Sequence, residues 1–361
     1  MNRVIPIDYR PWSESSANEI GYAGLEDTTN VHTYTHEDGT SHDVLVIDSR
    51  ENKDGPTILK SASLNYRIDP LLIRQETILA HKLGARVALA ELPGVSELPL
   101  TESGLVDTSI DIDQKISAVQ QTRKEFLEIS RGRFDLVAQK QLIALTDILG
   151  LSEGDTVELH GHSLGAMVAA TMGRVAAKHL TPVPLSISRI HLDDPSNVFN
   201  TSAMDFARLV KSSYKETARR NELYLNENIA IGHGDVTAFD LQSVTTKAID
   251  RYIKSRQRPV VINSLRAMRK GIAPIIDEAI HTGLQTGSIT PNTIVSSSHY
   301  RDSLVSNIAD HEALAEQVRS HDVQTEIFEY VPADDDRTEL GHLAGTSLGR
   351  TAAIAAMTKR H

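Results

Sequence analysis

The amino-acid sequence predicts an α/β protein with a mostly parallel central sheet flanked by helices. Short apolar runs, of the length of a buried strand, alternate along the chain with longer segments of helical periodicity. Strands that are joined by helical crossovers lie parallel within one sheet. The predicted strands of this kind are 57–59, 87–90, 157–160, 189–192, 293–296 and 324–330, and the predicted helices between them include 70–83, 112–149 and 308–320.

Two segments depart from this alternation. Residues 31–35 and 43–48 are separated by a short glycine-containing turn, which predicts an antiparallel hairpin before the parallel part of the sheet. Between residues 197 and 290 the alternation stops and the pattern becomes helical throughout. We therefore expect a core domain made of 1–196 and 291–361, with a helical lid inserted over 197–290.

Composition and charge limit the classes of protein that fit. The chain has 361 residues, of which 40% are hydrophobic and 24% are charged, as in a soluble globular protein. Its formal net charge of −11 opposes binding to a phosphate backbone, so we expect no nucleic-acid partner. No segment approaches the ~18 consecutive apolar residues of a membrane span, and the N-terminus has no apolar stretch of signal-peptide length. We therefore expect a cytoplasmic protein without a membrane span.

A candidate nucleophile stands at the centre of the motif Gly161-His162-Ser163-Leu164-Gly165. Because the chain contains no cysteine, its nucleophile has to be an oxygen or a lysine nitrogen. A strand is predicted directly before the motif and a helix directly after it, which suits a tight turn that presents a reactive serine. A dinucleotide-binding turn would need a third glycine that is missing at the required spacing. We therefore interpret Ser163 as a catalytic nucleophile.

Three segments resemble the α/β-hydrolase superfamily. Residues 161–166 are similar to its nucleophile elbow, 90–95 to its strand end and Pro-Gly turn, and 294–305 to the strand and turn that carry its catalytic acid. The resemblance spans 30–195 and 290–361 and is specific to the superfamily. It implies an α/β-hydrolase fold with an inserted helical lid and a catalytic triad that needs neither a cofactor nor a metal ion.

The resemblance also implies where the base lies, because in this family the triad residues follow the chain order Ser, Asp or Glu, His. His342 follows the last predicted strand in the setting Gly341-His342-Leu343, which resembles the family's final histidine loop. We therefore expect His342 to be the base. His299, His311 and His321 are the other candidates.

The expected acid is Asp302, which lies on the turn after the strand at 293–296. A buried carboxylate there would accept a hydrogen bond from His342 and hold its ring in the required tautomer. Asp193 and Asp194, at the end of the preceding strand, are the alternatives.

An oxyanion hole needs two backbone N–H groups that point at the developing negative charge. Leu164, the residue after the nucleophile, is expected to supply one. The other is expected from the loop after the strand at 57–60, where position favours Ser63, with Ala62 or Leu64 possible.

The sequence thus predicts a serine hydrolase that cleaves a carboxylic ester of a small molecule through an acyl-serine intermediate. The same residues would serve a thioesterase, an amidase, a C–C hydrolase or an acyltransferase. A non-catalytic protein that uses the pocket only to bind a small molecule or a partner is the alternative from another class. The sequence leaves the acyl chain, the leaving group and the oligomeric state open.

Overall fold

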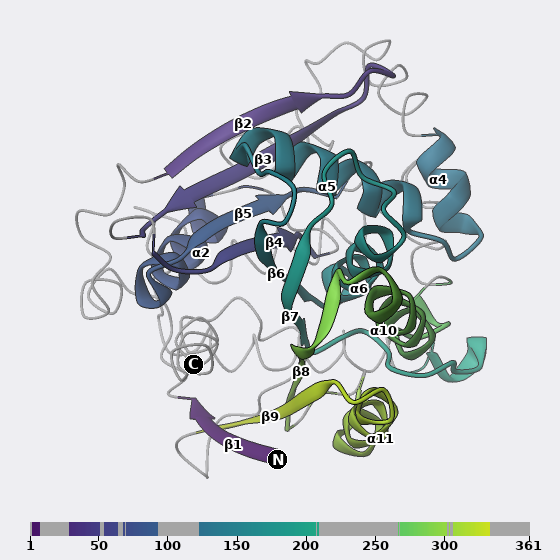
Figure 1. Ribbon diagram of the computed structural model, residues 1–361. Helices are drawn as coiled ribbons and strands as arrows, with labels where there is room; N and C mark the ends of the chain where they lie inside the picture. Colours follow the sequence, from purple (N-terminus) through teal and green to yellow (C-terminus); the bar gives the residue numbers. More distant parts are fainter. Residues whose placement is uncertain are drawn as a thin grey trace, which may run out of the picture.

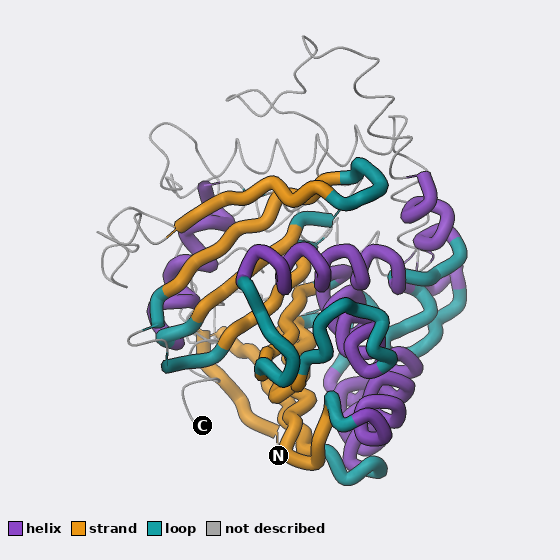
Figure 2. The backbone as a smooth tube through the Cα atoms, turned by 45° about the horizontal axis from the view of Figure 1, so that its top comes forward, coloured by secondary structure: helices purple, strands orange, loops and turns teal. Residues whose placement is uncertain are grey.

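The computed structural model describes residues 2–7, 29–50, 54–63, 68, 70–92, 123–206, 208, 266, 268–301, 303 and 306–332. Within these residues the strands form a nine-stranded sheet in the order β1-β9-β8-β7-β6-β4-β5-β3-β2. Figure 2 shows these strands as one continuous twisted sheet with helices packed beside it. The strands are β1 Asn2–Ile7, β2 Thr29–Thr35, β3 Ser41–Asp48, β4 Thr57–Ser61, β5 Arg86–Ala90, β6 Thr156–His162, β7 Ser186–Asp193, β8 Ile289–Tyr300 and β9 Gln324–Pro332.

The pairing of the strands confirms the predicted mixed sheet. β2 and β3 form the antiparallel hairpin, and β3 pairs antiparallel with β5. All remaining pairs, from β5 through β4, β6, β7, β8 and β9 to β1, are parallel. Parallel strands end at the same edge of a sheet, so the loops that follow β4, β6, β7, β8 and β9 begin side by side.

Helices cover both faces of the sheet (Figure 1). Successive side chains of β3, β4 and β5 point to opposite faces of the sheet, and the two sets pack with different helices. Leu45, Ile58 and Val87 pack with α2, whereas Val44, Leu59 and Ala88 belong to the larger core formed with α5, α6 and α10. The helices are α2 Pro70–Leu83, α4 Arg123–Ser130, α5 Asp135–Leu149, α6 Leu164–Ala177, α10 Ala273–Thr286 and α11 Ile308–Arg319.

One predicted helix is two helices in the structure. The periodicity predicts a single helix over 112–149, but α4 ends at Ser130 and α5 begins at Asp135. Gly132 has φ +72°, and its N–H donates to the carbonyl oxygen of Ile129 while the N–H of Arg133 donates to that of Glu128. This is the glycine-terminated helix end in which two carbonyl groups are capped by the turn that follows. The prediction was wrong because apolar spacing continues on both sides of the break.

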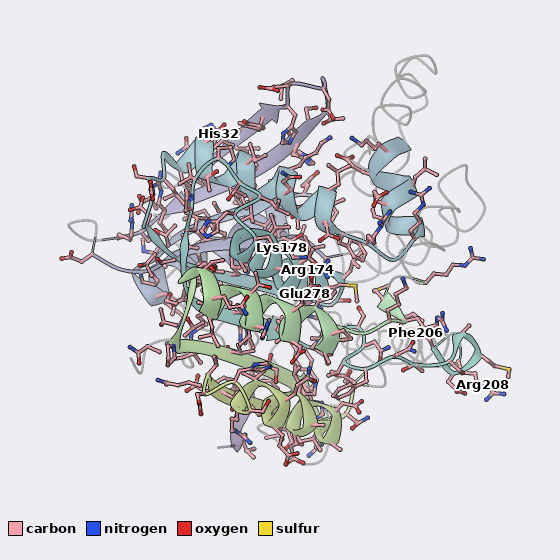
Figure 3. All side chains as sticks on the ribbon, turned by 45° about the vertical axis from the view of Figure 1, so that its right-hand side comes forward. His32, Arg174, Lys178, Phe206, Arg208 and Glu278 are labelled. Carbon is pink, nitrogen blue, oxygen red and sulfur yellow. The ribbon has the colours of Figure 1, made fainter. Side chains whose placement is uncertain are left out.

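The predicted lid over 197–290 stays a prediction, since 209–265 lies outside the described residues. Near the end of this range, α10 packs against α6 and β8. Glu278 of α10 binds Arg174 of α6 over 3.0 Å and Lys178 over 2.5 Å. Figure 3 shows these three side chains together. It also labels Phe206, which still belongs to the hydrophobic core, and Arg208, which is exposed. In this part of the chain, α10 is therefore tied to a helix of the core.

A buried ion pair joins the sheet to α2. The ammonium group of Lys60, on β4, lies 2.6 Å and 2.7 Å from the two carboxylate oxygens of Glu76, on α2. Both side chains are buried, and each charge needs the other as its counter-charge.

Among the described helices, none is long and apolar enough to cross a membrane.

Candidate active site

Ser163 occupies the sharp turn between β6 and α6. Its backbone has φ 54° and ψ −120°, a conformation that non-glycine residues rarely adopt. Such strain persists only where the surroundings enforce it, and it is concentrated at functional sites. The side chain is 9% exposed at the C-terminal edge of the parallel strands. The predicted nucleophile thus lies on a strained strand-to-helix turn, as the sequence motif requires.

The two glycines of the motif allow three segments to meet at this turn. A Cβ atom on Gly161 would lie 2.1 Å from the carbonyl oxygen of Gly165. A Cβ atom on Gly165 would lie 2.5 Å from the carbonyl oxygen of Ser61, at the end of β4. Neither contact is sterically possible, because both involve backbone atoms that cannot rotate away. Glycine at these positions therefore brings the start of α6 against β6 and against the loop after β4.

The predicted oxyanion donors lie on the segments that meet there. Leu164 is the first residue of α6, so its N–H is one of those that a helix leaves without an intrahelical acceptor. The N-terminus of α6 also carries the positive end of the helix dipole, which favours negative charge beside Ser163. Ala62 donates its N–H to the carbonyl oxygen of Ala90 and is therefore no longer a candidate. Ser63 follows it, is buried, and shows no backbone acceptor for its N–H among the described residues.

A second serine contacts Ser163, and no sequence motif predicted it. The hydroxyl oxygen of Ser196 lies 2.9 Å from that of Ser163, and Ser196 is 5% exposed. Ser196 stands in the loop after β7, the neighbour of β6 in the sheet. Its only sequence signal is its position just past a predicted strand, which many serines share.

Asp193, an alternative acid, contacts the turn at Ser163 through its backbone and β8 through its side chain. Its carbonyl oxygen accepts a hydrogen bond from the N–H of Ser163 over 3.1 Å. Its carboxylate accepts one from the hydroxyl of Ser298 over 2.7 Å, and Nδ1 of His162 lies 3.2 Å from the other carboxylate oxygen. Both atoms near Nδ1 of His162 are acceptors, so this nitrogen carries the proton.

Asp194, the other alternative, binds two serines that follow β8. The carboxylate accepts hydrogen bonds from the hydroxyl groups of Ser306 over 2.8 Å and Ser303 over 3.1 Å. Asp194 is fully buried and has φ 37°, so its backbone is also strained. Asp302 lies outside the described residues, but the neighbouring Ser303 donates its N–H to the carbonyl oxygen of Tyr300 over 2.8 Å. The turn therefore begins at the end of β8, on the same edge as Ser163.

The predicted base, His342, also lies outside the described residues. The strand before it, β9, ends at Pro332 and runs parallel to β8, so the chain leaves the sheet at the edge that carries Ser163. Two of the other candidate histidines have partners of their own. Nε2 of His311 lies 3.2 Å from the hydroxyl of Ser306, and Nε2 of His321 lies 2.8 Å from Asp277.

His299 and His311 stack on each other with ring centroids 5.5 Å apart. Burial lowers the pKa of His311 to about 4, with a smaller contribution from the neighbouring His299. Burial also lowers the pKa of His160, although Glu158 hydrogen-bonds its ring. The rings of His311 and His160 are therefore neutral at pH 7. Among the described residues there is no group of three or more His, Asp or Glu side chains arranged to hold a metal ion.

The antiparallel hairpin, the parallel strands that follow it and the serine elbow after the central strand β6 define an α/β-hydrolase fold. No protein-family model and no curated protein matches the chain.

Solved structures of low sequence identity align over most of the chain. The structure of DcsB in complex with its substrate analogue is 13% identical, covering 92% of this chain and 98% of that one with a TM-score of 0.45. A thioesterase domain from the curacin biosynthetic pathway is 13% identical, covering 92% and 99% with a TM-score of 0.44. A putative esterase from Staphylococcus aureus is 13% identical, covering 92% and 83% with a TM-score of 0.43.

Proposed function

We propose that the protein is a serine hydrolase that cleaves a carboxylic ester, or a related acyl bond, of a small molecule through an acyl-serine intermediate. The observation that carries the proposal is the backbone of Ser163, which is held at φ 54° at the N-terminus of α6. A serine with an ordinary structural role needs neither this strain nor the two glycines whose Cβ atoms would collide with the backbone.

In the proposed mechanism Ser163 attacks the acyl carbonyl carbon while His342 takes the proton of its hydroxyl. Asp302 accepts a hydrogen bond from the other ring nitrogen of His342 and stabilises the imidazolium that forms. The tetrahedral intermediate places its negative charge against the N–H groups of Leu164 and Ser63, and the dipole of α6 adds to this stabilisation. Loss of the leaving group gives the acyl-serine, which water then hydrolyses with His342 as base.

The order of the elements supports these roles. β6, β8 and β9 are parallel, and the three triad residues follow them in the sequence. The loops that carry the nucleophile, the acid and the base therefore start from one edge of the sheet. The predicted lid, 197–290, begins after β7 at this same edge, and we propose that its part before α10 covers Ser163 and selects the acyl chain.

A fluorophosphonate probe tests the proposal, because it forms a covalent bond only with an activated serine. We expect wild-type protein to be labelled once and Ser163→Ala to remain unlabelled. A matched control is Ser288→Ala, which removes a buried serine hydroxyl before β8, at the opposite end of the strands. Failure to label the wild type, or equal labelling of Ser163→Ala, would support a non-catalytic binding protein instead.

The class of acyl bond is tested with esters, thioesters and amides of graded chain length. The triad serves all of them, so differences in kcat/KM report on the pocket and not on the nucleophile. We expect esters to give the highest values. A thioester or amide that exceeds the matched ester would change the substrate class while leaving Ser163 as the nucleophile.

A further inference from the structure

The hydroxyl of Ser196 is placed to act on the nucleophile itself. Its oxygen lies 2.9 Å from Oγ of Ser163, which is hydrogen-bonding distance for two hydroxyl groups. Both side chains are buried, so water does not compete freely for this contact. No other described residue hydrogen-bonds to the hydroxyl of Ser196.

The backbone around Ser196 is fixed from two sides. On one side, the N–H of Asp194 donates to the carbonyl oxygen of Ser298 on β8 over 2.7 Å. On the other, the carbonyl oxygen of Asn197 accepts from the N–H of Ile272 over 3.2 Å, and the Asn197 side chain donates to the carbonyl oxygen of Arg269 over 2.9 Å. Pro195 further restricts the backbone between these anchors. The hydroxyl of Ser196 is thus positioned before any substrate binds.

The direction of the hydrogen bond follows from the proposed function. The Ser163 hydroxyl has a single proton, and this proton must point toward the base for attack to begin. Oγ of Ser163 can then only accept from Ser196. We infer that Ser196 is a further catalytic residue, whose hydroxyl donates a hydrogen bond to Oγ of Ser163 and stabilises that oxygen as a leaving group. This inference rests on the proposed hydrolase function.

The step that the Ser196 hydrogen bond should accelerate most is the breakdown of the acyl-enzyme. Water adds to the acyl carbon, the bond from this carbon to Oγ of Ser163 breaks, and its electron pair passes to Oγ. The protonated base returns a proton to Oγ, which releases the carboxylic acid and the free serine. Negative charge grows on Oγ during this step, and a hydrogen bond to a charged acceptor is stronger than one to a neutral acceptor.

The same hydrogen bond should accelerate acylation less. Only an interaction that is stronger in the transition state than in the ground state accelerates a step. Before acylation, Oγ belongs to a hydroxyl group that already accepts from Ser196. In the acyl-enzyme it is an ester oxygen, which is a weaker acceptor. Loss of the Ser196 hydroxyl should therefore slow deacylation more than acylation.

The experiment compares Ser196→Ala with wild type on p-nitrophenyl acetate and on a fluorophosphonate probe. Deacylation is followed as the steady-state rate after the burst of nitrophenol, and acylation as the rate of the burst and of probe labelling. We expect deacylation to slow by about tenfold to a hundredfold, the loss of one charge-assisted hydrogen bond, while acylation falls by less. The acyl-enzyme should accumulate and be visible by intact mass.

Two further variants separate this role from a structural one. Ser288→Ala, which removes another buried serine hydroxyl, should keep both rates, and Ser196→Gly should reproduce Ser196→Ala. A deacylation rate in Ser196→Ala within about twofold of wild type, the scatter of a neutral substitution, would overturn the inference. An equal loss in both steps would also overturn it, because displacement of the elbow harms them alike. Failure of the proposed function would show instead as a wild type that neither turns over the ester nor reacts with the probe.

Discussion

The N–H of Ser163 donates a hydrogen bond over 3.1 Å to the carbonyl oxygen of Asp193. This bond ties the strained elbow to the end of β7, and the loop that carries Ser196 begins directly after it. The hydroxyl groups of Ser163 and Ser196 are therefore both positioned by the backbone at the end of β7. A change that moves the end of β7 should alter both.

Gly165→Ala should damage the elbow without removing any reactive group. Its new Cβ would lie 2.5 Å from the carbonyl oxygen of Ser61, so α6 has to move away from β4. We expect the free energy of unfolding to fall by about 1–3 kcal/mol, as for other overpacked sites, and probe labelling to slow. Denaturant titration and labelling kinetics measure the two effects.

Gly173→Ala is the control in the same helix. Its Cβ would lie 3.0 Å from the end of the flexible Ile190 side chain, and alanine favours the helix by ~1 kcal/mol over glycine. Labelling should stay at the wild-type rate. If Gly165→Ala behaves like this control, close packing at the elbow does not matter for reactivity.

Asp302→Asn and Asp194→Asn should have different effects. If Asp302 is the acid, its amide should lower kcat by ~10³–10⁴ with little change in stability. Asp194→Asn removes a charge that accepts hydrogen bonds from Ser303 and Ser306, so it should mainly lower the free energy of unfolding, by about 1–3 kcal/mol. Measurements of kcat and of thermal unfolding for both variants distinguish the two roles. A larger loss of kcat in Asp194→Asn would transfer the role of the acid to Asp194.

His311 should make the protein less stable in mild acid. Burial lowers its pKa from 6.5 to about 4 in the folded state, whereas the nearby carboxylates of Asp194 and Asp193 oppose the shift. Between these two values the unfolded chain binds a proton that the folded protein does not. Stability from this group is therefore full above pH 6.5 and is lost as the pH falls toward 4, by about 3 kcal/mol in total.

Denaturant titrations from pH 7 to pH 4 measure this dependence. His311→Gln can still donate to Ser306 but does not titrate, so its stability should fall less steeply with pH. An unchanged slope in the variant would assign the acid sensitivity to other groups, of which His42 is one, because burial lowers its pKa to about 3.

Glu76→Ala should be strongly destabilising, because it leaves the buried ammonium group of Lys60 without a counter-charge. We expect a loss of about 3–5 kcal/mol. Arg208→Ala, which breaks the exposed ion pair with Asp205, should cost about 0–1 kcal/mol. Denaturant unfolding midpoints of the two variants measure both losses of stability. Equal losses of stability would mean that Lys60 finds another partner in the variant.

Local patterns in the sequence predicted most of the sheet. The structure confirms the hairpin and the predicted strands, and α2 spans the predicted residues 70–83, because apolar spacing reports directly which residues are buried. The break between α4 and α5 was missed, since a glycine that ends a helix resembles one tolerated within it. Strand β1 was also missed, because its pairing with β9 joins the two ends of the described chain.

The elbow at Ser163 is the part of the site that the sequence determined by itself. Its glycines, the strand before it and the helix after it are all neighbours in the chain, so short-range sterics specify the turn. Only the tertiary structure decided that Ser196 touches Ser163, that Asp194 holds the turn after β8 and that Ala62 donates to Ala90. These contacts join residues at the ends of different strands or in the loops and turns that follow them. They depend on the order and direction of the strands in the sheet, which no local pattern of side chains encodes.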